Sequence, residues 1–248
     1  LCDVDKQFYL DYIDWLRSSC KTTWGKPVSP KTAHSYYTTL RTALNEAVRE
    51  NLITSNPWYR LEMTEKIKVP ESKRDFLTIE EIKKMMATPF FNEQVRQAYL
   101  FSCFCGLRIS DIRKLRWRDL SMSGGQWRVS VVMTKTTNPV YIPLSSQAVK
   151  WLPERGDCTP DGLVFGGLPN EGNLCANLKN WAEKAGVKKN VTFHTARHSC
   201  AVLLLTLGAD IYTVSKILGH RSVRATQVYA KIVDKRKDDA IALVDNAF

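Results

Sequence analysis

Residues 194–208 read His-Thr-Ala-Arg-His-Ser-Cys-Ala-Val-Leu-Leu-Leu-Thr-Leu-Gly, a run in which polar residues precede a mostly apolar stretch. The apolar part predicts a buried helix, and Gly208 is the residue type expected just past its end. His194, Arg197 and His198 share one helix face, because their spacing is i, i+3 and i+4. The N–H groups at a helix start favour an anion, so a guanidinium and an imidazole at that end predict a phosphate pocket.

The composition limits what kind of protein this is. The 248 residues are 44% hydrophobic and 25% charged, which is typical of a globular chain and excludes wholesale disorder. No apolar run approaches the roughly 18 residues of a membrane span, and the first residues lack a signal-peptide pattern, so no membrane partner is expected. The chain begins without Met, which favours a fragment of a longer protein.

Charge and cysteine usage indicate the partner and the compartment. Lys and Arg number 36 against 25 Asp and Glu, a net charge of +11, which favours a nucleic acid as partner. The seven cysteines are scattered, with no Cys-x-x-Cys pair, so neither a disulfide framework nor a zinc site is expected. This pattern is typical of a reducing, cytoplasmic environment.

The sequence predicts two domains joined by a linker. Residues 1–64 are expected to form a helical domain, with helices around 8–16 and from about 29–31 to 51. Residues 65–75 lack apolar periodicity and predict a basic interdomain linker, in which Lys66, Lys68, Lys73 and Arg74 are expected to contact nucleic-acid phosphates. Residues 76–248 form the second domain, which starts with a capping-box pattern at Thr78–Glu81.

The second domain is expected to be mostly helical with a small antiparallel sheet. The alternating segment 126–143 predicts a hairpin around 136–138. Helices are predicted at 79–87, 92–104, 110–116, 145–152, 171–185, 195–207 and 211–218. Ser110 is the expected N-cap of the third of these, and Gly208 and Gly219 follow the last two.

Further polar residues lie beside predicted helix ends. Arg108 comes just ahead of the helix at 110–116, and Asp111 is placed to orient it from one turn on. Gly219-His220 follows the last of these helices, and Tyr229 stands nine residues after His220. Arg221 and Arg224 lie between them, where they are expected to contact phosphates.

Taken one at a time, these features have simpler explanations. A histidine at a helix start is often a solvated cap, an Arg–Asp pair on a surface contributes little, and a tyrosine in a terminal helix is usually part of the core. Their combination and order are specific. Arg108, Lys135, His194-x-x-Arg197, Gly219-His220 and Tyr229 together resemble the tyrosine recombinase, or phage integrase, family.

The resemblance covers residues 78–229. The flanking segments Gly106-Leu-Arg-Ile-Ser-Asp111, Leu218-Gly-His220 and Thr226-Gln-Val-Tyr229 are similar to signature segments of the family. The first domain resembles its core-binding domain, with weaker similarity at 32–36 and at Asn56-Pro57. Ala196 departs from the larger apolar residue that many members carry, at a position concerned with packing.

The resemblance implies transesterification of a DNA phosphodiester, with the Tyr229 hydroxyl attacking phosphorus and a 3′-phosphotyrosine intermediate that requires neither ATP nor a metal cofactor. A tyrosine hydroxyl titrates at about 10, so a base is needed, and the resemblance assigns His194 to it. Arg108 and Arg197 would neutralise the phosphoryl oxygens, and His220 would donate to one of them. Lys135 would protonate the leaving 5′-oxygen, while Asp111 and His198 would support this set.

The resemblance also implies an assembly on double-stranded DNA. The tail after Lys235-Arg-Lys237 has an amphipathic pattern, which predicts either a helix packed on its own domain or one that docks on a neighbour in a homo-tetramer. A DNA-bending accessory protein and a bacterial, nucleoid-associated location are further expectations, and a mobile-element integrase is the preferred role.

Two other functions fit part of the pattern. A type IB topoisomerase shares the chemistry but relaxes DNA as a monomer, and the core-binding segment and the tail favour a recombinase over it. In a catalytically silent DNA-binding regulator, the helix–Gly–helix pattern of residues 207–225 would be a helix-turn-helix motif. It would not explain why two arginines, two histidines and a tyrosine occur together.

Overall fold

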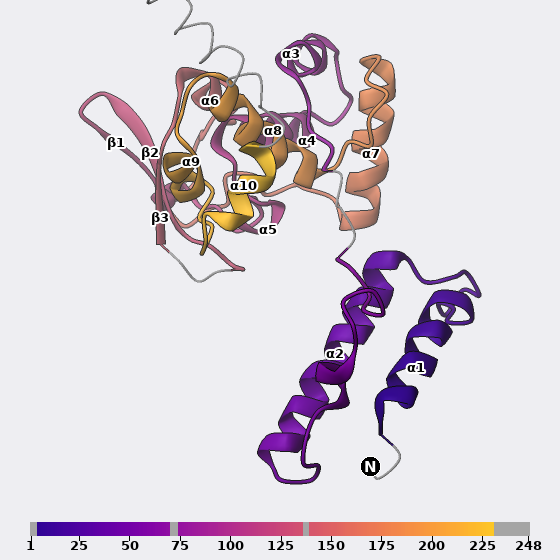
Figure 1. The fold of residues 1–248 in the computed structure, drawn as a ribbon. Coiled ribbons are helices and arrows are strands. Elements are labelled where there is room, and N and C mark those ends of the chain that lie inside the picture. Colours follow the sequence, from indigo (N-terminus) through magenta and orange to yellow (C-terminus); the bar gives the residue numbers. More distant parts are fainter. Residues whose placement is uncertain (1–3, 70–73, 136–138, 231–248) are drawn as a thin grey trace, which may run out of the picture. The chain divides into compact units, whose positions relative to one another are not determined.

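The computed structural model describes residues 4–69, 74–135 and 139–230. The chain divides into two compact units, Leu1–Lys73 and Arg74–Phe248, each with its own hydrophobic core. The helices and the small sheet of the second unit are seen in Figure 1. No helix in the described ranges combines the length and the apolar character needed to cross a membrane.

The first unit is helical. It consists of α1 (Lys6–Ser18), α2 (Pro30–Arg49) and the 3₁₀ helix η1 (Pro57–Arg60). The Asp5 carboxylate caps α1 by accepting the N–H of Phe8, and Ser29 caps α2 in the same way. Buried aromatic and aliphatic residues from both long helices, among them Tyr9 and Tyr37, fill the space between them.

Asn56 connects η1 to the rest of the first unit. Its side chain is buried, accepts the N–H of Trp58, and donates to the carbonyl of Arg41 and to Asn45. A buried amide with all of these partners fixes the chain at this turn. This network, together with Pro57, fixes the break in the chain between α2 and η1.

The second unit is mainly helical, as expected. Its helices are α3 (Ile79–Ala87), α4 (Glu93–Cys105), α5 (Ile109–Ile112), η2 (Trp117–Asp119), α6 (Ser146–Val149), α7 (Glu171–Lys184), α8 (Phe193–Thr206), α9 (Ile211–Ile217) and α10 (Arg224–Ala230). The Thr78–Glu81 capping box is formed, with each side chain bonded to the other residue's backbone. The prediction that Ser110 is the N-cap of α5 is wrong. Arg108 holds that position, and its side chain makes no capping hydrogen bond.

A three-stranded antiparallel sheet lies along one side of this unit (Figure 1). Its strands are β1 (Leu120–Ser123), β2 (Gln126–Val132) and β3 (Pro139–Pro143), paired in that order. The expected hairpin is β2–β3, in register at Val129 and Ile142, both of which are buried. The expected turn at 136–138 lies outside the described residues.

The core of the second unit centres on α4 and α8. Nearly every residue of α4 from Ala98 to Cys105 is buried, and α8 packs against it. Helix α10 lies against α8 and α9 (Figure 1), so the C-terminal part of the described chain is brought back to the helix that starts at Phe193.

Candidate active site

Arg197 is the most deeply buried charge of the site. It projects from α8 with 4% of its surface exposed, and its guanidinium donates to two backbone carbonyls, Gly106 at 2.7 Å and Leu218 at 2.5 Å. Burial, and next the charge of Arg108, lower the pKa of Arg197 to about 10. The group therefore remains a cation at neutral pH, held by neutral dipoles.

Two glycines make this arrangement possible. Gly106 ends α4 at a φ of 74°, and Gly219 follows α9 at 60°, both in the left-handed region that glycine accepts without strain. A Cβ on Gly106 would lie 2.6 Å from the Leu218 side chain, and one on Gly219 would lie 2.9 Å from Val140. Glycine at 106 thus allows the ends of α4 and α9 to approach around Arg197, and glycine at 219 allows the end of α9 to lie against Val140.

Arg108 lies beside Arg197, since its charge is among the causes that lower the pKa of Arg197. Its Nη1 atom faces the sulfur of Met133 at 3.8 Å, at the end of β2. A half-buried guanidinium with a sulfur as its partner keeps most of its donors for another acceptor. The two arginines thus belong to one site, as the phosphate pocket requires.

His220 is the third member of this group. Its Nδ1 atom lies 2.8 Å from the hydroxyl of the buried Thr226, on α10. Burial, followed by the charges of Arg197 and Arg108, lowers the pKa of His220 to about 4. The ring is therefore neutral at pH 7, and sequence reasoning gave Thr226 no role.

Tyr229 is buried in α10, with 1% of its surface exposed. Its hydroxyl oxygen lies 2.5 Å from Nδ1 of His198 and 3.0 Å from Nη1 of Arg74. The Arg74 guanidinium also lies over the tyrosine ring, with its carbon 5.3 Å from the centroid. Arg74 was expected to contact DNA phosphate from the linker; in the structure its partner is Tyr229, within the same unit.

The two histidines of α8 occupy different positions. The His198 ring is half-buried, with its centroid 5.4 Å from that of Tyr229, whereas His194 is exposed and stacks against His198 at 6.3 Å. Burial, followed by the charge of Arg74, lowers the pKa of His198 to about 4. His198 thus stands next to the tyrosine hydroxyl, a position that the sequence did not distinguish from that of His194.

Asp111 has a different partner from the one expected. It is buried, and one carboxylate oxygen accepts the N–H of Thr134 at 2.8 Å, while the other has no partner. The expected bond to Arg108 is replaced by this one, because the first turn of α5 faces the end of β2. Lys135 follows Thr134 directly, and its side chain is exposed.

The other cations that were expected to contact DNA belong to both units. Arg221 and Arg224 are exposed, on the loop after His220 and at the start of α10. In the first unit, Lys66 stacks on Trp58 with its amine 4.0 Å from the ring centroid, and Lys68 is exposed. Lys73 and the tail after Ala230 lie outside the described residues.

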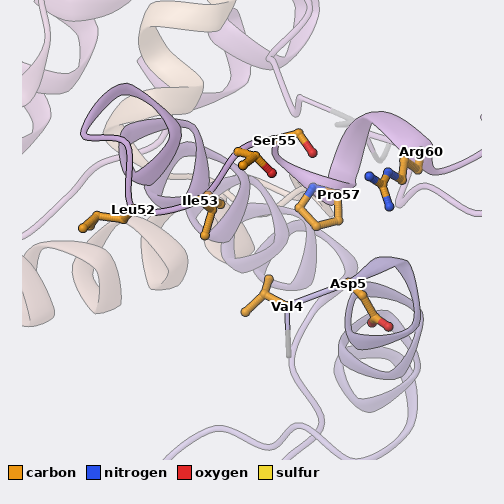
Figure 2. A pocket seen from close by; sticks show the side chains of 8 residues that line it. Val4, Asp5, Leu52, Ile53, Ser55, Pro57 and Arg60 are labelled. Carbon is orange, nitrogen blue, oxygen red and sulfur yellow. The ribbon is translucent and has the colours of Figure 1, made fainter. Parts of the chain in front are cut away.

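A pocket in the first unit offers no comparable chemistry. It is lined by Val4, Asp5, Leu52, Ile53, Ser55, Pro57 and Arg60 (Figure 2), together with Thr54. Its one carboxylate, that of Asp5, already caps α1. Among the described residues no three His, Cys, Asp or Glu side chains are grouped so that they could hold a metal ion.

Comparison with known families covers both units. The model of the phage integrase family matches residues 75–236, and that of the phage integrase SAM-like domain matches residues 1–69. A tyrosine recombinase of Pseudothermotoga lettingae is 32% identical over 185 residues, which are 71% of this chain and 64% of that protein. One from Thermosipho africanus is 30% identical over 228 residues, 88% of this chain and 77% of that protein.

Solved structures share the fold. The Tn1549 transposon integrase in complex with transposon right end DNA superposes with a TM-score of 0.71 at 15% identity, over 98% of this chain and 87% of that one. The XerH site-specific recombinase bound to palindromic difH substrate gives a TM-score of 0.66 at 19% identity, over 99% and 74% of the two chains.

Proposed function

Because the chain belongs to the phage integrase family and is a tyrosine recombinase, we propose that it cleaves and rejoins double-stranded DNA at specific sites through a 3′-phosphotyrosine on Tyr229. One observation carries the proposal above all. Two arginines and a neutral histidine, remote from one another in the sequence, gather in the unit that also holds Tyr229. Within residues 4–69, 74–135 and 139–230, no carboxylate is bonded to either of these neighbouring cations, which favours an anion between them.

The roles follow from the geometry and charge of each group. Arg108 and Arg197 would bind the non-bridging oxygens of the scissile phosphate and stabilise the charge of the transition state. His220 would donate to one of these oxygens: when Thr226 donates to Nδ1, the ring proton is on Nε2 and available. Arg197 is fixed by two carbonyls, so it needs no reorganisation during the reaction.

In the bond-breaking step, the Tyr229 oxygen forms a bond to phosphorus as the bond to the 5′-oxygen breaks. Lys135, exposed beside the sheet, would give that oxygen its proton, and Asp111 would position Lys135 through the backbone of Thr134. The phosphotyrosine retains the energy of the phosphodiester, so the reverse step needs no ATP. Tyr229 is buried in this structure, so a shift of α10 or of its neighbours must precede attack.

The finer parts of the proposal concern the assembly. The helical first unit would bind DNA as a core-binding domain, and Arg221, Arg224, Lys66, Lys68 and Lys73 would contact phosphates. The segment from residue 240 onward would dock on a neighbouring subunit in a homo-tetramer on paired sites, aided by a DNA-bending accessory protein. Integration of a mobile element in the bacterial nucleoid is the role that we favour.

A trapping experiment tests the function. The full chain is incubated with a library of duplexes that carry a nick near a randomised segment, because loss of the short cleaved fragment traps protein on DNA. Covalently held DNA is then sequenced at its ends, which gives both the site and the polarity of attachment. Tyr229→Phe should eliminate the adduct; an adduct that persists in this variant, or none with the wild type, refutes the proposal.

Two further measurements separate the alternatives. Strand exchange between two duplexes that carry the recovered site distinguishes a recombinase from a topoisomerase, which would only relax supercoiled DNA. Deletion from residue 240 onward should impair pairing of sites more than binding of one site. Unchanged pairing would remove the role of the tail.

A further inference from the structure

The Tyr229 hydroxyl has two side-chain partners that come from distant parts of the chain. Arg74 precedes α3 and lies 155 positions before Tyr229, and its Nη1 is 3.0 Å from the phenolic oxygen. His198 belongs to α8, and its Nδ1 is 2.5 Å from the same atom. This oxygen is the reacting atom of the proposed function, so both groups touch the reaction centre.

The chemistry of the three groups decides where the protons are. A guanidinium only donates hydrogen bonds, so Arg74 uses a lone pair of the phenolic oxygen. In the arrangement that gives the buried hydroxyl proton of Tyr229 an acceptor, this proton is directed at Nδ1 of His198. The imidazole therefore carries its own proton on Nε2.

We infer that Arg74 and His198 act together on Tyr229: His198 accepts the hydroxyl proton, and Arg74 binds the phenolate oxygen that remains. The inference rests on the proposed function and adds two catalytic residues to it. It also changes the expected proton acceptor, because His198 and not the exposed His194 contacts the hydroxyl. His194 stacks behind His198, 6.3 Å from ring to ring.

Arg74 is held in place by a bonded segment. In residues 74–78, which lead into α3, the N–H of Leu77 donates to Ser199 at 2.7 Å, and the carbonyl of Phe76 accepts from Lys189 at 2.9 Å. Ser199 is the residue after His198, and its hydroxyl donates to α8 itself at Thr195. One helix thus presents His198 and also anchors the segment that carries Arg74.

The charges around His198 suit a proton acceptor that works only with DNA bound. Arg74 faces it from the lead segment, His194 and Arg197 from α8, Tyr229 from α10 and His220 from the loop after α9. Burial and these charges keep the ring unprotonated at pH 7. A phosphate bound between the arginines brings negative charge that opposes them, which favours the protonated ring.

Cleavage begins with the transfer of one proton. The O–H bond of Tyr229 breaks and an N–H bond forms at Nδ1 of His198, while Arg74 stays hydrogen-bonded to the phenolate. The phenolate lone pair forms the bond to phosphorus, and the 5′-oxygen leaves with a proton supplied from the proposed acid, Lys135. On rejoining, a 5′-hydroxyl gives its proton to Lys135 and its oxygen bonds to phosphorus, while the tyrosine oxygen leaves and takes its proton back from His198.

The first test needs no DNA. Nitrogen NMR of the full chain, with the His198 signals identified by loss in His198→Asn, should show a neutral ring protonated on Nε2 at pH 7. Arg74→Ala removes a neighbouring cation, so the His198 titration should move to higher pH, while His34 in the other unit stays unchanged. A ring protonated on Nδ1, or a titration unaffected by Arg74→Ala, overturns the pair.

The second test uses a nicked duplex that carries the site recovered by trapping, at saturating protein. Removal of Arg74 should slow formation of the covalent intermediate about 10- to 100-fold, with partial recovery in Arg74→Lys, and His198→Asn about 10²- to 10⁴-fold. Arg118→Ala removes an exposed arginine paired with Asp161 and should match the wild type.

Three kinetic outcomes would overturn the inference. A loss in Arg74→Ala that higher protein concentration restores would make Arg74 only a DNA contact. Faster cleavage in either variant would make the two contacts a restraint that keeps Tyr229 inactive. Unchanged rates in both would leave them no part in the reaction. If the wild type forms no covalent intermediate, the proposed function fails instead, and the NMR result still decides whether the pair exists.

Discussion

Gly106→Ala tests whether the close approach of two helix ends builds the site. Gly106 has a φ of 74°, and an added Cβ would lie 2.6 Å from Cδ2 of Leu218 and 3.3 Å from the sulfur of Cys200. Both neighbours are buried, so neither has room to move freely. The substitution therefore combines backbone strain with overpacking.

The magnitude follows from these two contributions. An alanine in the left-handed region costs about 1–2 kcal/mol, and an extra methyl group in a packed core costs about 1–3 kcal/mol more. Gly124→Ala is the matched control, because its φ is 57° and nothing lies within 4 Å of its added Cβ. It should lose only the backbone part, about 1–2 kcal/mol, against about 2–5 kcal/mol for Gly106→Ala.

Thermal unfolding of the full chain followed by calorimetry measures the difference. In a unit of this size about 1 kcal/mol corresponds to roughly 2–4 °C in Tm, so the control separates clearly from the test variant. Gly106→Ala should also reduce covalent adduct formation in the folded fraction, because Gly106 and Leu218 supply the carbonyls that hold Arg197. Equal losses of stability in the two variants would refute the packing argument.

Three further predictions follow from the same site. Arg197→Ala should lower the rate of covalent adduct formation by about 10²–10³ while gel-shift affinity for DNA stays close to wild type, and a parallel loss of affinity would make Arg197 a phosphate anchor only. The pKa values of His198 and His220 lie near 4 in the folded chain against an ordinary 6.5, so the unfolded chain binds more protons between these values. Their contribution to stability is then complete above about pH 6.5 and is lost as the pH falls toward 4, and urea midpoints of His220→Gln should depend less on pH in this window. Ser199→Ala leaves the Leu77 N–H without its partner, so hydrogen exchange at that amide should accelerate while exchange in the sheet stays unchanged.

Local signals in the sequence were sufficient for most helices. The helix at 79–87 was predicted with its exact bounds, because the Thr78–Glu81 capping box fixes its start and the apolar spacing its face. The hairpin was predicted because β2 and β3 alternate clearly. The strand β1 was missed: of its four residues only Leu120 is buried, so it lacks the apolar alternation on which such predictions depend.

The start of α5 shows a limit of capping rules. Ser110 is a good N-cap residue by type, yet the N-cap is Arg108, two residues earlier, and the helix begins at Ile109. The left-handed Gly106 turns the chain sharply after α4, and the bonds of Asp111 and Ile112 to the Arg108 carbonyl start the helix there. Tertiary packing of the preceding turn, which the sequence does not display, decided the boundary.

The sequence predicted several residues of the candidate site, but not which of these side chains contact one another. Arg108, Arg197, His220 and Tyr229 were predicted as one set because their combination and order resemble those of a known family. The contact between Tyr229 and Arg74 could not be predicted, because Arg74 lies in a segment without apolar periodicity, 155 residues before the tyrosine. Which histidine of α8 faces the tyrosine depends on how α10 packs, since i and i+4 positions lie on nearly the same face.

The shifts of pKa in this pocket point to its ligand. Arg197, His198 and His220 are each shifted toward the uncharged form, by burial first and then by cations that include Arg74 or Arg108. A pocket selected for stability alone would pair these groups with carboxylates, but Asp111, the buried carboxylate beside them, bonds a backbone N–H and contributes least among the causes acting on Arg197. An anion bound among the cations opposes the part of each shift that the neighbouring positive charges cause, while the part due to burial remains. The phosphate of the proposed function would supply negative charge that the described neighbours of Arg197 provide only weakly.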